Sequence, residues 1–361
     1  MLTIGLPNNC KFLLKLVIFL GYRTGNLNLQ YAFLKSILKI MNILPNGGKS
    51  KEMQSEQSNN SLKKSESDSG KQTVDLAAPG VAKAVSKRIL EDIDNYCVKT
   101  YDGGHRNHLG ASLIGRECKR QLWYIFRWCL REPTTGRQQR LFNRGHREEA
   151  RFIEWLRGIG FEVWAETEDG KQYRISGVNG HFGGSLDGIG KLPPASGIDE
   201  AVLLEFKTNG TGAGFNKLDS HGMPIAKPDH FAQTSTYGFK YGFRFCAYLN
   251  INKNDDSLHV EIVKLDHNLG AQMEMKAEQI IHSKTAPARL SDNPTYRGCG
   301  WCAMKGICHN GEMPEKNCRS CTYALPVENA EWFCSLPAHN SIIPAEFIPK
   351  GCGNWQPITK A

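Results

Sequence analysis

The stretch Val202-Leu203-Leu204-Glu205-Phe206-Lys207-Thr208 predicts a short β-strand that carries both an acid and a base. Side chains alternate between the two faces of a strand, so Glu205 and Lys207 share one face. Leu204 and Phe206 then share the other face. A carboxylate and an ammonium group are therefore expected side by side, above an apolar layer.

A second segment, from His181 to Gly188, precedes this strand and is rich in glycine. We expect it to form the hairpin partner of the strand and to end at Asp187. Asp187, Glu205 and Lys207 would then converge on one metal ion. Cleavage of a phosphodiester with Mg²⁺ or Mn²⁺ needs carboxylates to hold the metal. Lys207 would orient the attacking water or offset charge in the transition state.

The composition is that of a globular protein with a basic balance. The chain has 361 residues, a net charge of +9 and a pI near 8.9. This length suggests one large domain with an appendage, or two domains. The positive charge favours a polyanionic partner, and nucleic acid is the natural candidate.

The twelve cysteines indicate metal binding if the protein is cytoplasmic, which is our expectation. The apolar run from Phe12 to Leu20 contains Lys15 and lacks a signal-peptide cleavage site. It is also too short to span a membrane, so we expect no membrane partner.

The order of patterns predicts an α/β fold with a central mixed sheet flanked by helices. Residues 1–45 form an extension of uncertain role, with a possible amphipathic helix at 31–43, and the polar residues 46–80 are predicted to be a disordered linker. Helices are expected at 81–97, 115–128, 140–158, 229–241 and 268–284. The apolar stripe of the first should pack on the core, and Ser112 is the expected N-cap of the second. Strands are expected at 161–166, 173–177, 181–187, 202–207, 243–251 and 259–265.

The order of the motifs resembles the PD-(D/E)-x-K nuclease superfamily, and within it the RecB-like exonucleases. A helix with acidic residues comes first, then Gly-Ser-Leu-Asp187-Gly, then Leu-Leu-Glu205-Phe-Lys207, then Gln233-x3-Tyr237. The resemblance implies a restriction-endonuclease-like core over residues 81–310. It also implies that Gln233 and Tyr237 face a DNA-binding cleft. The proline of the superfamily label is absent before Asp187.

The same resemblance implies a further metal ligand on the helix over 140–158. RecB-like enzymes place an acid or a histidine four residues after a glycine, and Gly145 with Glu149 has that spacing. His146 and Glu148 are rival ligands, because one helical turn presents several candidates.

The C-terminal cysteines form two sets. Cys299, Cys302 and Cys308 have the spacing C-x2-C-x5-C, and with Cys118 they resemble the iron-sulfur subset of RecB-like nucleases, such as CRISPR-associated and AddB-type enzymes. The resemblance implies a [4Fe-4S] cluster that closes the nuclease domain. Cys318, Cys321, Cys334 and Cys352 would form a small zinc-binding module over residues 311–361. A different grouping, Cys299 and Cys302 with Cys318 and Cys321, also has the spacing of a zinc site.

Together these features predict a metal-dependent DNA exonuclease in recombination, repair or phage DNA processing. Its partner would be DNA with free ends or a single strand, with a possible recombination partner protein. A non-catalytic module for DNA ends or a replication complex is the alternative, and a structure-specific endonuclease is another.

Overall fold

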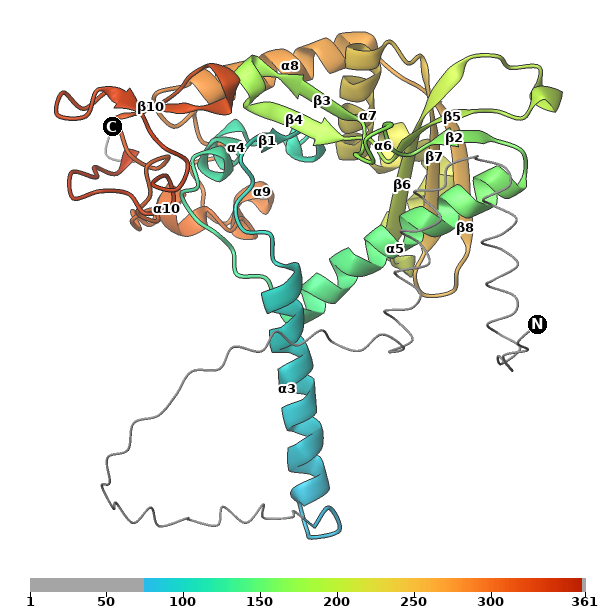
Figure 1. Ribbon diagram of the computed structural model, residues 1–361, viewed down its shortest axis with the longest axis horizontal. Helices are drawn as coiled ribbons and strands as arrows, with labels where there is room; N and C mark the ends of the chain where they lie inside the picture. The colour runs from blue at the N-terminus through green and yellow to red at the C-terminus, as the bar shows by residue number, and fades with distance from the viewer. Residues whose placement is uncertain (1–74, 359–361) are drawn as a thin grey trace, which may run out of the picture. The chain divides into compact units, whose positions relative to one another are not determined.

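A computed structural model describes residues 75–358 of the chain (Figure 1). The predicted extension over residues 1–45, its expected helix, and the predicted linker up to residue 74 lie outside this range. Within it, no helix is both long and apolar enough to cross a bilayer.

The central sheet has five strands in the order β2-β5-β6-β7-β8. Strands β6 and β7 run parallel, and the other neighbours are antiparallel, so the sheet is mixed as predicted. The strands are β2 (Glu162–Trp164), β5 (Gly188–Lys191), β6 (Ala201–Asn209), β7 (Phe245–Asn252) and β8 (Leu258–Lys264).

Helices cover both faces of this sheet, which confirms the α/β fold class (Figure 1). Leu204 and Phe206 face α5 (Gly136–Gly158), where Phe206 stacks on Phe152 with ring centroids 5.0 Å apart. Leu203, on the opposite face, belongs to the larger core that includes Tyr237 of α7. The period-2 prediction for β6 is therefore confirmed. The remaining long helices on this side are α6 (Asn216–Ala226), α7 (Pro228–Tyr241) and α8 (His267–His282).

The segment before Asp187 is not the hairpin partner of β6, as the sequence suggested. Strand β4 (Phe182–Ser185) belongs to a separate sheet, between β1 (Leu109–Gly110) and β3 (Arg174–Gly177). The partner of β6 is β5, with Gly188 opposite Leu204. Only residues 186 and 187 separate β4 from β5. Both strands are rich in glycine, so no side-chain pattern marks the change of sheet. Asp187 therefore lies where the chain passes from one sheet to the other.

Two helix starts differ from prediction. Helix α5 begins at Gly136, because Thr135 and Gln138 form a reciprocal capping box. Helix α4 (Lys119–Phe126) is capped by Cys118, whose Sγ accepts a hydrogen bond from the Gln121 amide at 3.4 Å. The predicted cap, Ser112, lies instead in a short 3₁₀ turn over residues 111–113.

The apolar stripe of α3 (Val81–Tyr101) was expected to pack on the core and does not. Ile89, Ile93 and Tyr96 are exposed, and Cys97 is the buried residue of the helix. Helix α3 instead meets the start of α5, where a Cβ on Gly136 would lie 2.4 Å from Asp94 Cα. The amphipathic pattern thus correctly indicated a helix but not its packing partner.

The C-terminal segment contains a small antiparallel sheet in the order β11-β10-β9. Its strands are β9 (Ala324–Pro326), β10 (Trp332–Cys334) and β11 (Ser341–Ile342), and the short helices α9 (Arg297–Gly300) and α10 (Lys305–His309) precede them. Trp332 packs 5.3 Å from Phe126 of α4, ring centroid to ring centroid. The segment after residue 310 therefore shares the core of the preceding domain.

Candidate active site and two cysteine clusters

The acidic residues and the lysine predicted to converge do lie together. Lys207 forms an ion pair with Glu205 Oε1, and its Nζ lies 3.8 Å from Asp187 Oδ2. The Phe206 amide donates a hydrogen bond of 2.7 Å to Asp187 Oδ2. The alternation of β6 brings Glu205 and Lys207 together, while the link between two sheets supplies Asp187.

Burial sets the electrostatics of this group. Burial raises the pKa of Glu205 to about 7; Lys207 opposes the rise, and the carboxylates of Asp187 and Glu149 add to it. For Lys207, burial lowers the pKa, but the charges of Glu205 and Asp187 outweigh it and raise the pKa overall. Lys207 is therefore an ammonium ion at neutral pH. Glu205 is fully buried, and its Oε2 has no hydrogen-bond partner among residues 75–358.

Of the three rival ligands on α5, Glu149 is the one that interacts electrostatically with Asp187 and Glu205. Burial and the charge of Asp187 raise its pKa. His146 is 77% exposed, and its Nδ1 lies 3.3 Å from Glu149 Oε1. Glu148 is buried in an ion pair with Arg151 at 2.7 Å. Glu149 and His146 therefore share one surface, whereas Glu148 is occupied elsewhere.

A cleft of about 440 Å³ opens beside this group. Glu149, Phe206 and Lys207 line its inner side, and Arg106 and Phe142 also border it. Phe142 is 56% exposed, so an aromatic ring faces solvent near the acidic residues. The cleft thus combines the Glu149 carboxylate, the cations Arg106 and Lys207, and an exposed aromatic surface.

Gln233 and Tyr237 do not line this cleft, contrary to expectation. Both are buried, and Gln233 Nε2 donates a hydrogen bond of 3.3 Å to Tyr237 Oη. Burial, together with the charge of Glu205, raises the pKa of Tyr237. The two side chains approach the acidic group from the core, because residues 232–238 of α7 are all buried.

The sequence reasoning missed a buried polar chain beside Lys207. His230 Nδ1 lies 2.9 Å from Tyr248 Oη, which accepts a hydrogen bond of 3.0 Å from Asn250 Nδ2. Burial lowers the pKa of His230 to about 3, and the charge of Lys207 adds to this. The sequence indicates this chain in one respect, because Tyr248 and Asn250 are polar residues at alternate positions of an otherwise apolar strand.

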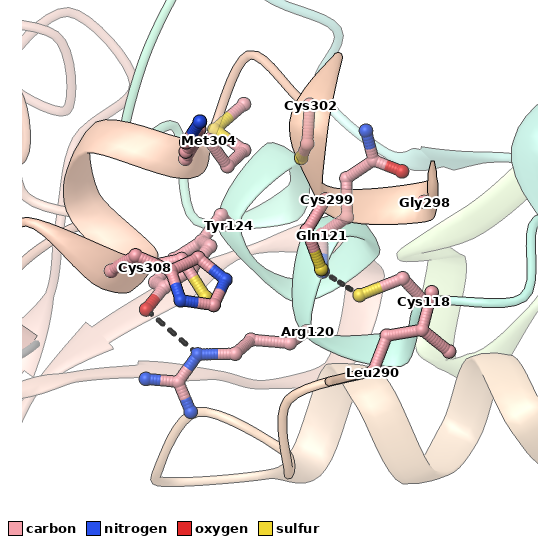
Figure 2. Close-up of a pocket in the computed structure, with 12 residues that line it drawn as sticks. Cys118, Arg120, Gln121, Tyr124, Leu290, Gly298, Cys299, Cys302, Met304 and Cys308 are labelled. Carbon is pink, nitrogen blue, oxygen red and sulfur yellow. Dashed lines mark hydrogen bonds between the residues drawn. The ribbon is translucent and has the colours of Figure 1, made fainter. Parts of the chain in front are cut away.

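The structure brings the first cysteine set together around one cavity (Figure 2). Cys118 reaches it from the start of α4, and Cys299, Cys302 and Cys308 reach it from the C-terminal segment. Burial raises the pKa of the Cys302 thiol, and the three neighbouring sulfur atoms raise it further. This arrangement differs from the grouping of Cys299 and Cys302 with the later cysteines.

The second cysteine set also comes together. Cys318 and Cys321 lie in one turn, in which the Cys321 amide donates to the Cys318 carbonyl at 3.0 Å. Cys318, Cys334 and Cys352 line one cavity of about 290 Å³. Burial raises the pKa of Cys318 to about 11, and the other three cysteines add to the rise.

All the cysteines that the structure describes are free thiols. As the side chains stand, no three His, Cys, Asp or Glu residues between 75 and 358 form a closed set that could hold a metal ion.

The chain matches no known family profile and no curated protein sequence at a significant level. Among solved structures, it resembles LHK-Exo in complex with dAMP, with 17% identity, coverage of 50% of this chain and 90% of that chain, and a TM-score of 0.36. For the alkaline exonuclease LHK-Exo from Laribacter hongkongensis, the identity is 18%, the match covers 50% of this chain and 90% of that chain, and the TM-score is 0.33. For the structure of SSO0001, the identity is 16%, the match covers 61% of this chain and 96% of that chain, and the TM-score is 0.36. Likeness at these values assigns no role to any residue, so the roles below rest on the geometry.

Proposed function

We propose that this protein is a metal-dependent DNA nuclease that hydrolyses phosphodiester bonds from DNA ends. The observation that carries the proposal is the group of three carboxylates, Glu149, Asp187 and Glu205, around the Lys207 ammonium beside one cleft. Buried carboxylates cost free energy unless a cation offsets their charge. Lys207 is one cation for three acids, which leaves charge for a metal ion to neutralise.

The residues fit Mg²⁺ or Mn²⁺. Both ions prefer carboxylate oxygens, and Glu205 Oε2 is buried without a partner. Asp187 and Glu205 would hold the ion, with Glu149 or His146 as a further ligand from α5. Such an ion, when bound, polarises a scissile phosphate.

Lys207 acts in this proposal as a fixed positive charge. Because its pKa is raised, it keeps its proton at neutral pH and is a poor general base. Its ammonium group would instead orient the attacking water and offset charge on the phosphorane-like transition state. Glu205 and Asp187 hold Lys207 in place through the contacts described above. Gln233 and Tyr237 would support the group from the core rather than touch DNA.

The cleft fits an unpaired DNA strand. Arg106 offers a cation for phosphate, and Phe142 and Tyr101 offer exposed rings on which bases can stack. The chain's net charge of +9 favours the same polyanion. Two other basic residues have partners of their own, since Arg120 donates to the Pro287 carbonyl at 2.8 Å and Lys240 pairs with Glu274 at 2.6 Å.

For the first cysteine set we propose a [4Fe-4S] cluster with a structural role. Cys118, Cys299, Cys302 and Cys308 surround one cavity, and a cluster of this kind takes four thiolates. Cys118 caps α4, and its Sγ already accepts the Gln121 amide hydrogen bond at the edge of the cavity. Binding would tie the C-terminal segment to α4 across about 180 residues of chain.

We place the activity in recombination, repair or phage DNA processing, with a possible recombination partner protein. A non-catalytic module that binds DNA ends or a replication complex would not need three acids and a lysine at a cleft. A structure-specific endonuclease would use the same residues.

The substrate form separates these functions. Purified protein is incubated with end-labelled linear DNA and with covalently closed circular DNA, in Mg²⁺, Mn²⁺ or EDTA. Degradation of linear DNA alone, abolished by EDTA and by Asp187→Ala, supports an exonuclease. Cutting of closed circles would identify an endonuclease, and binding without cleavage would identify the non-catalytic module.

A further inference from the structure

Two arginine side chains lie in the core without a carboxylate partner. Arg127 follows α4, and Arg319 lies between the second-set cysteines Cys318 and Cys321. Each arginine is 1% exposed, and neither forms an ion pair within residues 75–358. Arg127 Nη1 lies 3.4 Å from the Arg319 carbonyl oxygen, so the two residues are neighbours.

Carbonyl groups and aromatic rings only partly satisfy these guanidinium groups. Arg127 donates to the Ala324 carbonyl at 2.7 Å, and Arg319 donates to the Asn107 carbonyl at 3.2 Å. Both lie over the ring of Trp332, at 5.0 Å and 4.6 Å from its centroid. Three of their nitrogen atoms, Arg127 Nε and Arg319 Nε and Nη2, have no hydrogen-bond partner in the described part of the chain.

Two adjacent buried cations repel each other and carry a large desolvation cost. Aromatic faces return a small part of that cost for each cation. Negative charge close to Arg127 and Arg319 would offset the remaining cost. Cys129 is near both, but burial raises the pKa of its thiol to about 12, so it remains neutral.

The second cysteine set can supply such charge when it binds a metal ion. Cys321 belongs to the same buried cluster as Phe126 and Trp332, which pack against the two arginines. Free thiols carry no charge, and neither do disulfides. Four thiolates around one divalent ion carry a net charge of about −2, which equals the two arginine charges in magnitude.

We propose that Cys318, Cys321, Cys334 and Cys352 bind one zinc ion as a tetrathiolate, which is the counter-charge for the buried Arg127 and Arg319. The two-residue spacing of Cys318 and Cys321 in one turn matches structural zinc sites. The Gln356 amide lies 3.5 Å from Cys321 Sγ as a donor, as outer groups around zinc thiolates do. The inference is independent of the proposed nuclease function.

The ligand assignment is tested on the full-length protein, prepared without oxygen, by measuring zinc and iron in each variant. The wild type is expected to hold about one zinc per chain. Cys318→Ser with Cys334→Ser loses the zinc and keeps the iron, if any is bound. The matched variant Cys302→Ser, in the first set, keeps the zinc. Zinc retained in the double variant, or a disulfide within this set, overturns the assignment.

A second measurement covers the case in which the serine variant fails to fold. Wild-type protein in which cobalt replaces zinc is examined by visible absorption, which reports tetrahedral thiolate ligation. Alkylation with mass spectrometry then shows which cysteines the metal protects. Protection of all four second-set cysteines, lost with a chelator, supports the site, and protection of fewer than four contradicts it.

The charge pairing has its own test in Arg127→Met, which keeps an unbranched apolar stem and removes the charged guanidinium group. A chelator is expected to lower the melting temperature of the wild type by about 10 °C, because both buried cations lose their counter-charge. The shift should be smaller in Arg127→Met, and its competition-measured zinc affinity weaker. Equal shifts and equal zinc affinities in the two proteins would overturn the pairing.

Discussion

The Phe206 amide donates a 2.7 Å hydrogen bond to Asp187 Oδ2, which fixes the link between two sheets to the strand that carries Glu205 and Lys207. The bond places the Asp187 carboxylate 3.8 Å from Lys207 Nζ. The backbone thus holds an acid from a sheet junction beside an ammonium group from a central strand.

Neutralising Glu149 should lower nuclease activity while leaving the fold intact. Glu149→Gln is expected to reduce the rate of DNA degradation by about 100-fold, because it removes one of three charges that surround the proposed metal ion. The rate is measured on end-labelled DNA at saturating Mg²⁺.

Glu148→Gln is the matched control one residue earlier. Glu148 is buried with Arg151, so this change should lower the free energy of unfolding but leave the rate per folded molecule within a few-fold. A larger loss of rate in Glu148→Gln than in Glu149→Gln would reverse the assignment of the helix ligand.

Gly184 allows β4 to approach α7 closely. A Cβ at this position would lie 2.5 Å from Tyr237 Oη and 3.0 Å from Ala111 Cβ. Gly184→Ala should therefore lower the free energy of unfolding by about 1–3 kcal/mol, measured by chemical denaturation. Adding Tyr237→Phe, which removes the hydroxyl group, should recover part of the loss. No recovery in the double variant would show that the strain lies elsewhere.

The buried imidazole of His181 should make stability fall in acid. Burial lowers its pKa to about 4, from an ordinary value of 6.5, and its Nε2 bonds to the Val327 carbonyl at 2.8 Å. Below pH 6.5 the unfolded chain binds a proton that the folded chain refuses, so the free energy of unfolding falls as pH drops toward 4.

His181→Phe removes that titration and keeps a ring against Phe126 and Trp332. The urea midpoint, measured at about pH 7 and about pH 5, should change less in this variant than in the wild type. An equal change in both proteins would mean that other groups cause the acid sensitivity.

The first cysteine set should give the protein a colour. Anaerobically prepared wild type is expected to be brown and to hold about four iron atoms per chain, and Cys302→Ser to lose both. Cys246→Ser is the control, because Cys246 is a buried cysteine outside both sets. Colourless wild-type protein without iron would contradict the cluster.

Sequence periodicity predicted most of the elements, because β6, α7 and α8 carry clear period-2 or helical patterns. It could not place β4 and β5 in different sheets, since the glycines around Leu186 carry no pattern. Asp187 was expected to reach Glu205 and Lys207 through a hairpin, and it reaches them from the link between β4 and β5.

Local sequence patterns could not predict which element packs on which. The stripe of Ile89 and Ile93 predicted a helix correctly but gave the wrong partner. Gln233 and Tyr237 matched a motif, yet their burial depends on how α7 packs against the sheet. The pairing of Arg127 with Arg319 joins residues almost 200 positions apart, which no local pattern reveals.

The most direct test of the central claim measures how fast each protein degrades end-labelled single-stranded DNA in Mg²⁺. We compare the wild type with Lys207→Ala, and with Lys264→Ala as a control at an exposed lysine of β8. The account predicts a loss of about 100- to 1,000-fold in Lys207→Ala, with unchanged circular dichroism, and a rate close to wild type in Lys264→Ala. Equal rates for Lys207→Ala and the wild type would contradict it.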